Sequence, residues 1–388
     1  MNLRHLSLHH LPYSERPARQ DFLSLLEQFT LLEHLTLVRA FPKNIAAGSS
    51  NLGRTIYLPN LMNISLTGTV LEMVNIVECI PLQPAVRIQC HVDRMGDLKT
   101  NFWKFAKVLG SHFHSIMEEM PLDTLVLMGH EEGLRFTEEC IFNPDFKQSF
   151  RIRAFGLTEE DPLLDLTIGP DAHTSHDEIL IAALTSVCDT LPLANVHTLT
   201  LQNLDFVTQK SWPRLLRSFS SLRIIDIGGY PPTGLLWALL LNARSHSHLE
   251  HDDMLSMLLP SLEDVYLHNV DCFAGGLMVS SSGPVNSHCD LDDSRFLEVL
   301  AAYLEDRQQC SLALRSLSIS RCNNVSLDVL KDIQGSVSHL LWDNRGMYKT
   351  ASSRSDTEGL AIYRNQWSSN PPALRHYFRL RTLLELDL

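Results

Sequence analysis

One short pattern of apolar residues returns along the whole chain. An apolar residue is followed by two further residues, a second apolar residue, one more residue and a third apolar residue, as in Leu314, Leu317 and Ile319. The last two apolar residues alternate with polar ones, which is typical of a strand with one buried face. Twelve copies begin at residues 3, 32, 61, 85, 122, 163, 196, 222, 262, 314, 337 and 383, and the copy at 85 is weak.

Segments with helical spacing of apolar residues separate many of these copies. Strand, turn and helix in regular succession predict parallel strands joined by right-handed crossovers. The copies lie on average about 35 residues apart, more than the ~20–29 of a regular leucine-rich repeat, so the extra length is expected in loops and helices. The expected helices lie within residues 21–29, 97–120, 175–191 (opened by a capping box at Ser175–Glu178), 212–219, 234–242, 252–259, 292–309 and 326–334.

These elements predict an α/β fold of the leucine-rich-repeat solenoid type. It would be curved, with parallel strands on the concave face and helices on the convex face. The alternative is a doubly wound α/β domain, whose strands also alternate with helices but are continuous apolar runs because both sheet faces are covered. Here Ser, Thr, His, Asp and Asn stand between the leucines, so one sheet face is predicted to face water.

The predicted organisation has three parts. Residues 1–343 form the solenoid, with a loop insertion at 274–294 that is rich in Gly, Ser and Asp. Residues 344–372 are a polar, Ser-rich segment that closes on two prolines, and the sequence leaves its order open. Residues 373–388 contain the last copy of the pattern and would complete the solenoid with a terminal helix or strand.

Composition and charge narrow the classes of function. The chain has 388 residues, of which 44% are hydrophobic, and its formal net charge is −13. An acidic surface repels phosphate backbones, so we expect no nucleic-acid partner. The densest apolar run, 235–241, is far shorter than the ~20 residues that cross a bilayer, and no signal peptide is visible. The eight cysteines form no CxxC pair and are expected to be reduced, so we predict a cytoplasmic or nuclear protein without membrane association.

A search for catalytic motifs finds no GxSxG, P-loop, HExxH or GxGxxG sequence. The segment 290–301 is similar to a calcium loop but lacks the glycine at its sixth position and the acid at its twelfth. His246, His248 and His251 are followed by two aspartates, and both residue types bind transition metals. Their spacing fits no defined site, so we interpret them as loop histidines and predict no catalytic residue, no metal site and no cofactor.

The outward polar positions of the strands form the candidate binding surface. Interfaces favour Tyr, Trp and Arg as anchors, and Tyr266 with Asp264 and His268 is the best local group. The alternative is that these residues only keep the strand face soluble. Further outward positions include His5, Ser7, His9, Thr67, Thr124, Thr198, Thr200, Gln202 and Ser320. The candidate binding residues are His34, Thr36, Asn63, Ser65, Asp264, Tyr266, His268, Ser316 and Ser318.

One unit carries a resemblance to a known family. Residues 314–330 resemble the cysteine-containing leucine-rich repeat, in which a cysteine, here Cys322, is buried in the turn three residues after the last strand leucine. The wider sequence is similar to the leucine-rich-repeat region of fungal F-box proteins, especially those of mushroom-forming fungi, closely over 255–343 and loosely elsewhere. Other copies depart from the cysteine form, with Thr69, His130, Leu204, Tyr230 and Val270 at that position.

The resemblance implies a non-enzymatic protein–protein interaction module. In that family the repeats hold a protein target while an N-terminal F-box docks on a cullin-RING ubiquitin ligase. The repeat begins here at residue 3 and no F-box is visible, so the ligase adaptor is an expected partner only if an F-box lies upstream. We expect a fragment of a longer protein or a divergent relative. The alternatives are a free-standing leucine-rich-repeat scaffold, or a metal-binding hydrolase that uses the 246–251 histidines.

Overall fold

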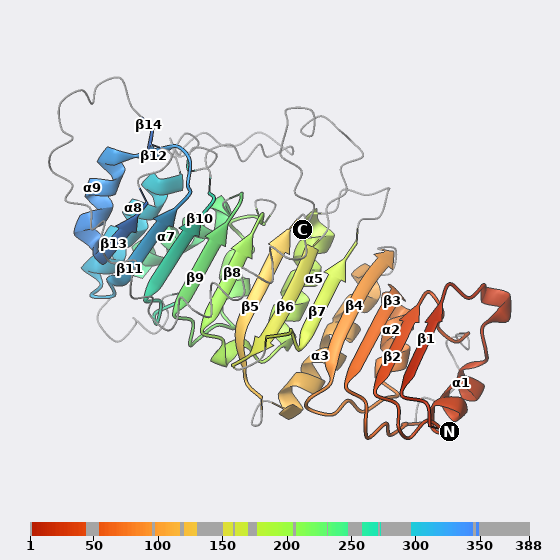
Figure 1. Cartoon of the computed structure of the whole chain (residues 1–388). Coiled ribbons are helices and arrows are strands. Elements are labelled where there is room, and N and C mark those ends of the chain that lie inside the picture. Colours follow the sequence, from red (N-terminus) through yellow and green to blue (C-terminus); the bar gives the residue numbers. More distant parts are fainter. Residues whose placement is uncertain are drawn as a thin grey trace.

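The computed structural model of the chain contains one large sheet, which crosses the molecule from end to end (Figure 1). It describes residues 2–43, 54–94, 98–116, 120–129, 150–157, 160–169, 177–204, 207–230, 232–246, 258–270, 272, 296–343 and 347–348. The strands of this sheet are β1 (His5–His9), β2 (His34–Val38), β3 (Asn63–Thr69), β4 (Arg87–Arg94), β5 (Leu122–Gly129), β6 (Phe150–Gly156), β7 (Leu164–Ile168), β8 (Thr198–Gln202), β9 (Ile224–Gly228), β10 (Asp264–His268), β11 (Leu314–Ser320) and β13 (Val337–Trp342).

The predicted strands are confirmed wherever the structure describes them. Eleven of the twelve copies of the apolar pattern coincide with strands, and the weak copy at residue 85 leads into β4. The copy at residue 383 lies outside the described residues. A second, two-stranded sheet pairs β12 (Val325–Ser326) with β14 (Met347–Tyr348), so part of the predicted polar segment 344–372 is a short strand.

The helices also follow the sequence, with one exception. They are α1 (Arg19–Leu26), α2 (Val70–Val77), α3 (Leu98–Ile116), α5 (Asp177–Thr190), α6 (Trp212–Leu216), α7 (Thr233–His246), α8 (Phe296–Gln309) and α9 (Leu327–Ser336), with 3-10 turns η1 (Tyr13–Glu15) and η2 (Leu193–Asn195). We did not predict α2, which begins at a capping box formed by Thr69 and Glu72. Of the predicted helix 252–259, only residues 258 and 259 are among the described residues. The predicted loop 274–294 and the first two residues of the predicted capping box Ser175–Glu178 lie outside them.

The order of the strands departs from the predicted succession. Along the sheet the order is β1-β2-β3-β4-β7-β6-β5-β8-β9-β10-β11-β13. The chain passes from β4 to β5 three places away, then fills the gap by returning through β6 and β7. β6 is antiparallel to both of its neighbours, while the other pairs in this sheet are parallel. The prediction of parallel strands throughout is therefore wrong for β6, and the fold is a mixed α/β fold with an open, mostly parallel sheet.

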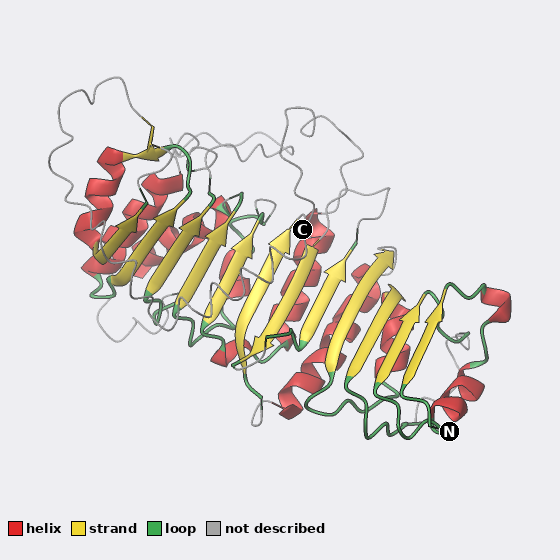
Figure 2. Cartoon of the chain, viewed as in Figure 1, coloured by secondary structure: helices red, strands yellow, loops and turns green. Residues whose placement is uncertain are grey.

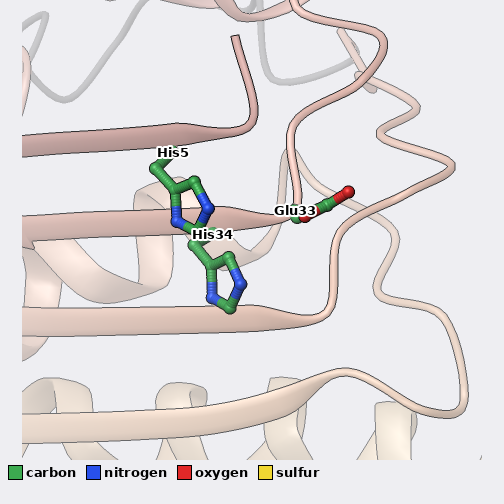
Figure 3. A group of neighbouring side chains, drawn as sticks. All are labelled: His5, Glu33 and His34. Carbon is green, nitrogen blue, oxygen red and sulfur yellow. The ribbon is translucent and has the colours of Figure 1, made fainter.

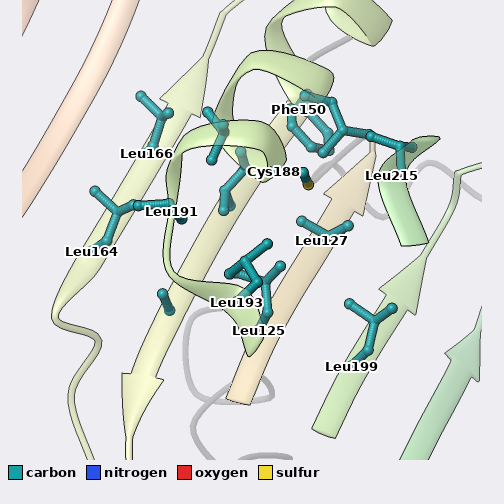
Figure 4. Packing of buried hydrophobic residues seen from close by; sticks show 14 of the residues in the cluster. Leu125, Leu127, Phe150, Leu164, Leu166, Cys188, Leu191, Leu193, Leu199 and Leu215 are labelled. Atoms are coloured by element: carbon teal, nitrogen blue, oxygen red, sulfur yellow. The ribbon is translucent and has the colours of Figure 1, made fainter. Parts of the chain in front are cut away.

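The helices lie against one face of the sheet (Figure 2). Burial of the apolar positions on that face supplies the core, at about 1.5–3 kcal/mol for each large aliphatic side chain. In the middle of the molecule, Leu125 and Leu127 of β5 and Leu166 of β7 pack beneath α5, near its Cys188 (Figure 4). No described helix covers the opposite face of the sheet, which we call the open face.

A recurrent turn closes many of the strands. The residue after the strand adopts a left-handed backbone conformation, and its N–H reaches a carbonyl at the end of the next strand, as from His10 to Val38 (2.7 Å) and from Arg39 to Thr67 (2.8 Å). At Gly229 a side chain could not fit, because a Cβ would lie 2.1 Å from Oδ1 of Asn203. The residues with this conformation directly after a strand are His10, Arg39, Asn203, Gly229, Asn269 and Arg321. His10, Arg39, Asn203 and Asn269 donate to a carbonyl of the next strand, whereas the N–H of Arg321 donates to Oδ2 of Asp343 (2.7 Å).

None of the described helices combines the length and the apolar character needed to span a membrane.

Candidate functional site

The open face carries mostly polar strand positions, with exceptions such as Val126 of β5 and Leu341 of β13. In β10, Val265 and Leu267 point towards the helices and are buried, whereas Tyr266 and His268 lie on the open face and stay partly accessible. The same alternation holds in β2 and β3, where the apolar positions are buried and the intervening positions are partly exposed. The period of two in the sequence therefore assigns side chains to the correct face.

The nine predicted binding residues fall into two separate groups on this face. His34 and Thr36 of β2 are register partners of Asn63 and Ser65 of β3. Towards the other end of the sheet, Asp264 and Tyr266 of β10 are register partners of Ser316 and Ser318 of β11, and His268 lies opposite Ser320. The strands β4, β7, β6, β5, β8 and β9 lie between the two groups, so these residues do not form one compact site.

Asp264 is occupied by neighbours within the chain. Its side chain is almost completely buried, and its carboxylate accepts hydrogen bonds from Nε of Arg315 (3.0 Å), Nη2 of Arg315 and Oγ of Ser316 (2.8 Å). The hydrogen bond to Asp264 and the charge of its carboxylate raise the pKa of Arg315 above the usual value of an arginine. Asp264 thus positions Arg315 and Ser316, and Arg315 is the member of the group whose side chain reaches solvent.

Tyr266 lies between two acidic groups. Burial and the nearby Asp264 carboxylate raise the pKa of its phenol, so Tyr266 stays a neutral hydrogen-bonding group at physiological pH. Next to it, Nδ1 of His268 lies 2.7 Å from Oδ1 of Asp226 on β9. The ring of His268 packs against Gly228, where an added Cβ would lie 2.6 Å from Nε2. Gly228 is therefore required for the position of the His268 ring.

The centre of the open face contains a charged group that the sequence analysis missed. Arg151 of β6 donates two hydrogen bonds to Asp165 of β7, at 2.7 and 2.6 Å, and Nε of Arg153 lies 3.5 Å from the same carboxylate. The side chains of Arg153 and Asp165 are nearly buried. The alternation of apolar and basic residues in Phe150–Gly156 is a strand signal, but this segment lies outside the recurrent apolar pattern.

Two histidines meet at the β1 end of the open face (Figure 3). His5 of β1 and His34 of β2 are register partners, and their rings stack with centroids 4.3 Å apart and planes inclined by 6°. The ligand atoms of His5, His34 and Glu33 all lie within 4.8 Å of one another. The amide of Asn63 lies 3.0 Å from Nδ1 of His34. Outward positions were predicted for both histidines, but Glu33 was not connected with them.

A shallow polar hollow lies at the edge where β8 to β11 begin. Its wall includes His197, Arg223, Glu263 and Ser311. Nδ1 of His197 lies 2.9 Å from Asp123, and Glu263 pairs with Arg315 (3.2 Å). These alternating charges link neighbouring units along the edge of the sheet. The histidine group 246–251 considered for metal binding lies, apart from the backbone of His246, outside the described residues.

Comparison with known proteins adds no relative to this description. No protein-family model matches the chain, and no curated protein matches it.

Proposed function

We propose that the chain is a leucine-rich-repeat protein that binds a protein target with its open face and has no enzymatic role. By the resemblance of residues 255–343, its setting would be target recognition of the F-box/leucine-rich-repeat ubiquitin-ligase type. The observation that carries the proposal is the open face itself, a continuous surface of alternate strand positions on which no described helix packs. Repeat proteins with stacked strands commonly use such an extended surface for binding.

Repeated backbone contacts support the leucine-rich-repeat assignment. At the start of successive units one carbonyl accepts two N–H groups from the next unit: Arg4 from Glu33 and His34, and Glu263 from Arg315 and Ser316. The left-handed turns after the strands repeat in the same way. Equivalent contacts at equivalent positions are expected of stacked copies of one unit.

The position of Cys322 also supports the resemblance to the cysteine-containing repeat. Its side chain is buried after β11 and lies within hydrogen-bond distance of the carbonyl oxygens of Ser320 (3.4 Å) and Leu267 (3.6 Å). At the same position of other units, Leu204 and Val270 are completely buried. An apolar side chain thus substitutes for the thiol in units that depart from the cysteine form.

The face offers chemistry suited to a protein partner. Small hydroxyl groups stand beside the Tyr266 ring and beside guanidinium groups held in place by Asp165 and Asp264. Tyr and Arg are the residue types enriched at interface hot spots, and preorganised side chains lose less entropy on binding. Asp264, one of the predicted binding residues, is buried and would therefore act by holding Arg315 and Ser316 in place rather than by touching the partner.

The test compares single Ser→Arg substitutions on the two sides of the sheet. Ser65→Arg and Ser318→Arg place a long charged side chain on the open face, and Ser245→Arg places the same group on an exposed position of α7. The tagged proteins are incubated with a fungal lysate, and bound proteins are quantified by mass spectrometry. We expect a set of proteins whose captured amount is at least tenfold lower with an open-face variant than with the unsubstituted chain. The amount captured by Ser245→Arg should be unchanged.

Two other outcomes would alter the assignment. Equal capture by Ser65→Arg, Ser318→Arg and Ser245→Arg would refute binding by the open face. Capture that depends on the open face but contains no cullin-RING adaptor, with the full natural reading frame as bait, would leave a free-standing scaffold without a link to a ligase.

A further inference from the structure

We propose that His5, Glu33 and His34 form a binding site for one divalent transition-metal ion, with Zn²⁺ as the best match. The site lies at the β1 end of the open face (Figure 3). Two imidazoles and one carboxylate are a common protein ligand set for zinc, and they leave a coordination position for water. This inference concerns a metal and stands independently of the proposed protein target.

The sheet fixes the spacing of the two histidines. His5 and His34 occupy directly opposed positions of β1 and β2, and neighbouring strands in a sheet lie about 4.8 Å apart. Their rings are nearly parallel, with centroids 4.3 Å apart. The backbone thus places the two side chains within reach of one ion, and only the orientation of the rings has to change on binding.

The distances between the possible ligand atoms are longer than those in an occupied zinc site. The ligand atoms of the three residues are within 4.8 Å of one another, whereas two nitrogens bound to one tetrahedral zinc ion would be about 3.3 Å apart, given Zn–N bonds of about 2.0 Å. Because the lone pairs of the stacked rings lie in parallel planes, the rings must turn out of the stack for their nitrogens to converge on one ion. His5 is exposed, and both His34 and Glu33 are partly exposed, so the side chains have room to rotate and the ion has an open path.

Backbone hydrogen bonds to both neighbouring segments fix Glu33 directly before β2, beside His34. Its N–H donates to the carbonyl of Arg4 (2.8 Å), and its own carbonyl accepts from Met62 (2.8 Å) and Asn63 (3.1 Å). The carboxylate pairs with Arg4 at 2.9 Å, but the Arg4 side chain is 65% exposed. Because such exposed ion pairs contribute little free energy, a divalent cation can displace Arg4 from Glu33.

Asn63 supplies an outer contact of the kind that metal-binding histidines use. Its amide nitrogen Nδ2 lies 3.0 Å from Nδ1 of His34. Binding of an ion at Nε2 would require the amide to turn over, so that Oδ1 accepts the proton of Nδ1 and Nε2 carries the lone pair. The contact with Asn63 engages Nδ1, so Nε2 is the nitrogen of His34 that is left to approach an ion.

Other histidines on the described part of the chain lack this arrangement. His197 and His268 each have one carboxylate neighbour, and His9 contacts the hydroxyl of Ser7 at 2.6 Å. Among the described residues, His5, Glu33 and His34 form the one group of three metal-ligating side chains that approach one another. The net charge of −13 favours the approach of a cation.

The experiment uses the whole chain with His246, His248 and His251 changed to Ala, which removes the other histidine-rich segment as a source of background. After treatment with a chelator, this protein is titrated with ZnCl₂ in a calorimeter. We expect one Zn²⁺ per chain, with affinity lowered at least tenfold by His5→Ala or His34→Ala and also lowered by Glu33→Gln. His10→Ala is the matched control, since His10 is an exposed histidine directly after β1, and it should leave the affinity unchanged.

Two further variants separate a designed site from nonspecific binding by surface histidines. Asn63→Ala should weaken Zn²⁺ binding by about 10- to 100-fold, as expected for loss of an outer contact. Arg4→Ala should strengthen it, because Glu33 is then no longer paired. Circular dichroism checks that each variant is folded. Absence of a one-to-one binding event, or equal affinities for His34→Ala and His10→Ala, would overturn the proposal.

Discussion

Arg307 on α8 is a buried cation that joins two units of the sheet. Its side chain is 1% exposed, and its guanidinium donates to the carbonyls of Leu259, Leu262 and Leu312 and to the hydroxyl of Tyr303, all at 3.0–3.2 Å. Leu259 and the residue before Leu312 have left-handed backbone conformations. A planar group with five donors can satisfy several carbonyls at once, so a residue that reads as a surface charge in the sequence becomes part of the interior.

His112 on α3 predicts how stability depends on pH. Burial lowers the pKa of this histidine to about 4, and its Nε2 has no hydrogen-bond partner. Below pH 6.5 the unfolded chain binds a proton at this residue and the folded chain does not, so stability should fall between pH 6.5 and pH 4. The loss from this residue is about 2–3 kcal/mol at pH 4.5.

Substitution tests this effect. His112→Leu should reduce the difference in the free energy of unfolding between pH 7 and pH 4.5 by about 2–3 kcal/mol, measured by urea titration at both values. The control is His114→Leu, because His114 is exposed on the same helix. An unchanged pH difference in His112→Leu would show that the folded protein protonates this residue as readily as the unfolded chain does.

At the scale of the element, β6 is the feature that the sequence analysis missed. Its charge pattern, with Arg151 and Arg153 between apolar residues, is that of a strand. None of the copies of the recurrent apolar pattern identified in the sequence falls on β6, which runs antiparallel to both neighbours, so that pattern does not predict it. α2 was missed for another reason: Val70–Val77 is mostly apolar and rich in valine and isoleucine, so its period does not separate helix from strand.

The junction of β6 and β7 should depend on Asp165. Asp165→Asn would leave the guanidinium groups of Arg151 and Arg153 without their shared carboxylate in a nearly buried position. We expect a loss of about 3 kcal/mol in the free energy of unfolding, since breaking a buried ion pair leaves a charge uncompensated.

The comparison is Asp161→Asn, which removes the exposed partner of Arg87 and should cost at most about 1 kcal/mol. Chemical denaturation of both variants gives the two values. If Asp165→Asn were no more destabilising than Asp161→Asn, the ion pair at the centre of the open face would have no structural importance.

At the scale of the whole molecule, the strands stack side by side along an elongated body, with β1 and β13 as its edges (Figure 1). A compact globule of 388 residues would have a radius of gyration of about 21 Å. We expect a larger value from small-angle X-ray scattering of the monomer. A value at or below that of a compact globule would contradict the extended arrangement of the sheet.

The two histidines at the β1 end show how far sequence reasoning could reach. His5 and His34 both stand at the third position of consecutive copies of the apolar pattern, so in-register parallel pairing would place them side by side. The contact with Glu33 and the amide of Asn63 could not be predicted in the same way, because it depends on how side chains turn at the edge of the sheet.

The sequence by itself determined most of the strands and helices, with β6 and α2 as exceptions, and which side of the predicted strands faces the helices. These properties follow from periodicities of two and 3.6 along a local stretch of chain. Only the tertiary structure decided that β4 lies beside β7, that β6 stands reversed among parallel strands, and that Asp264 is buried beneath Arg315. Those outcomes depend on which distant segments pair with one another, and no local period records that choice.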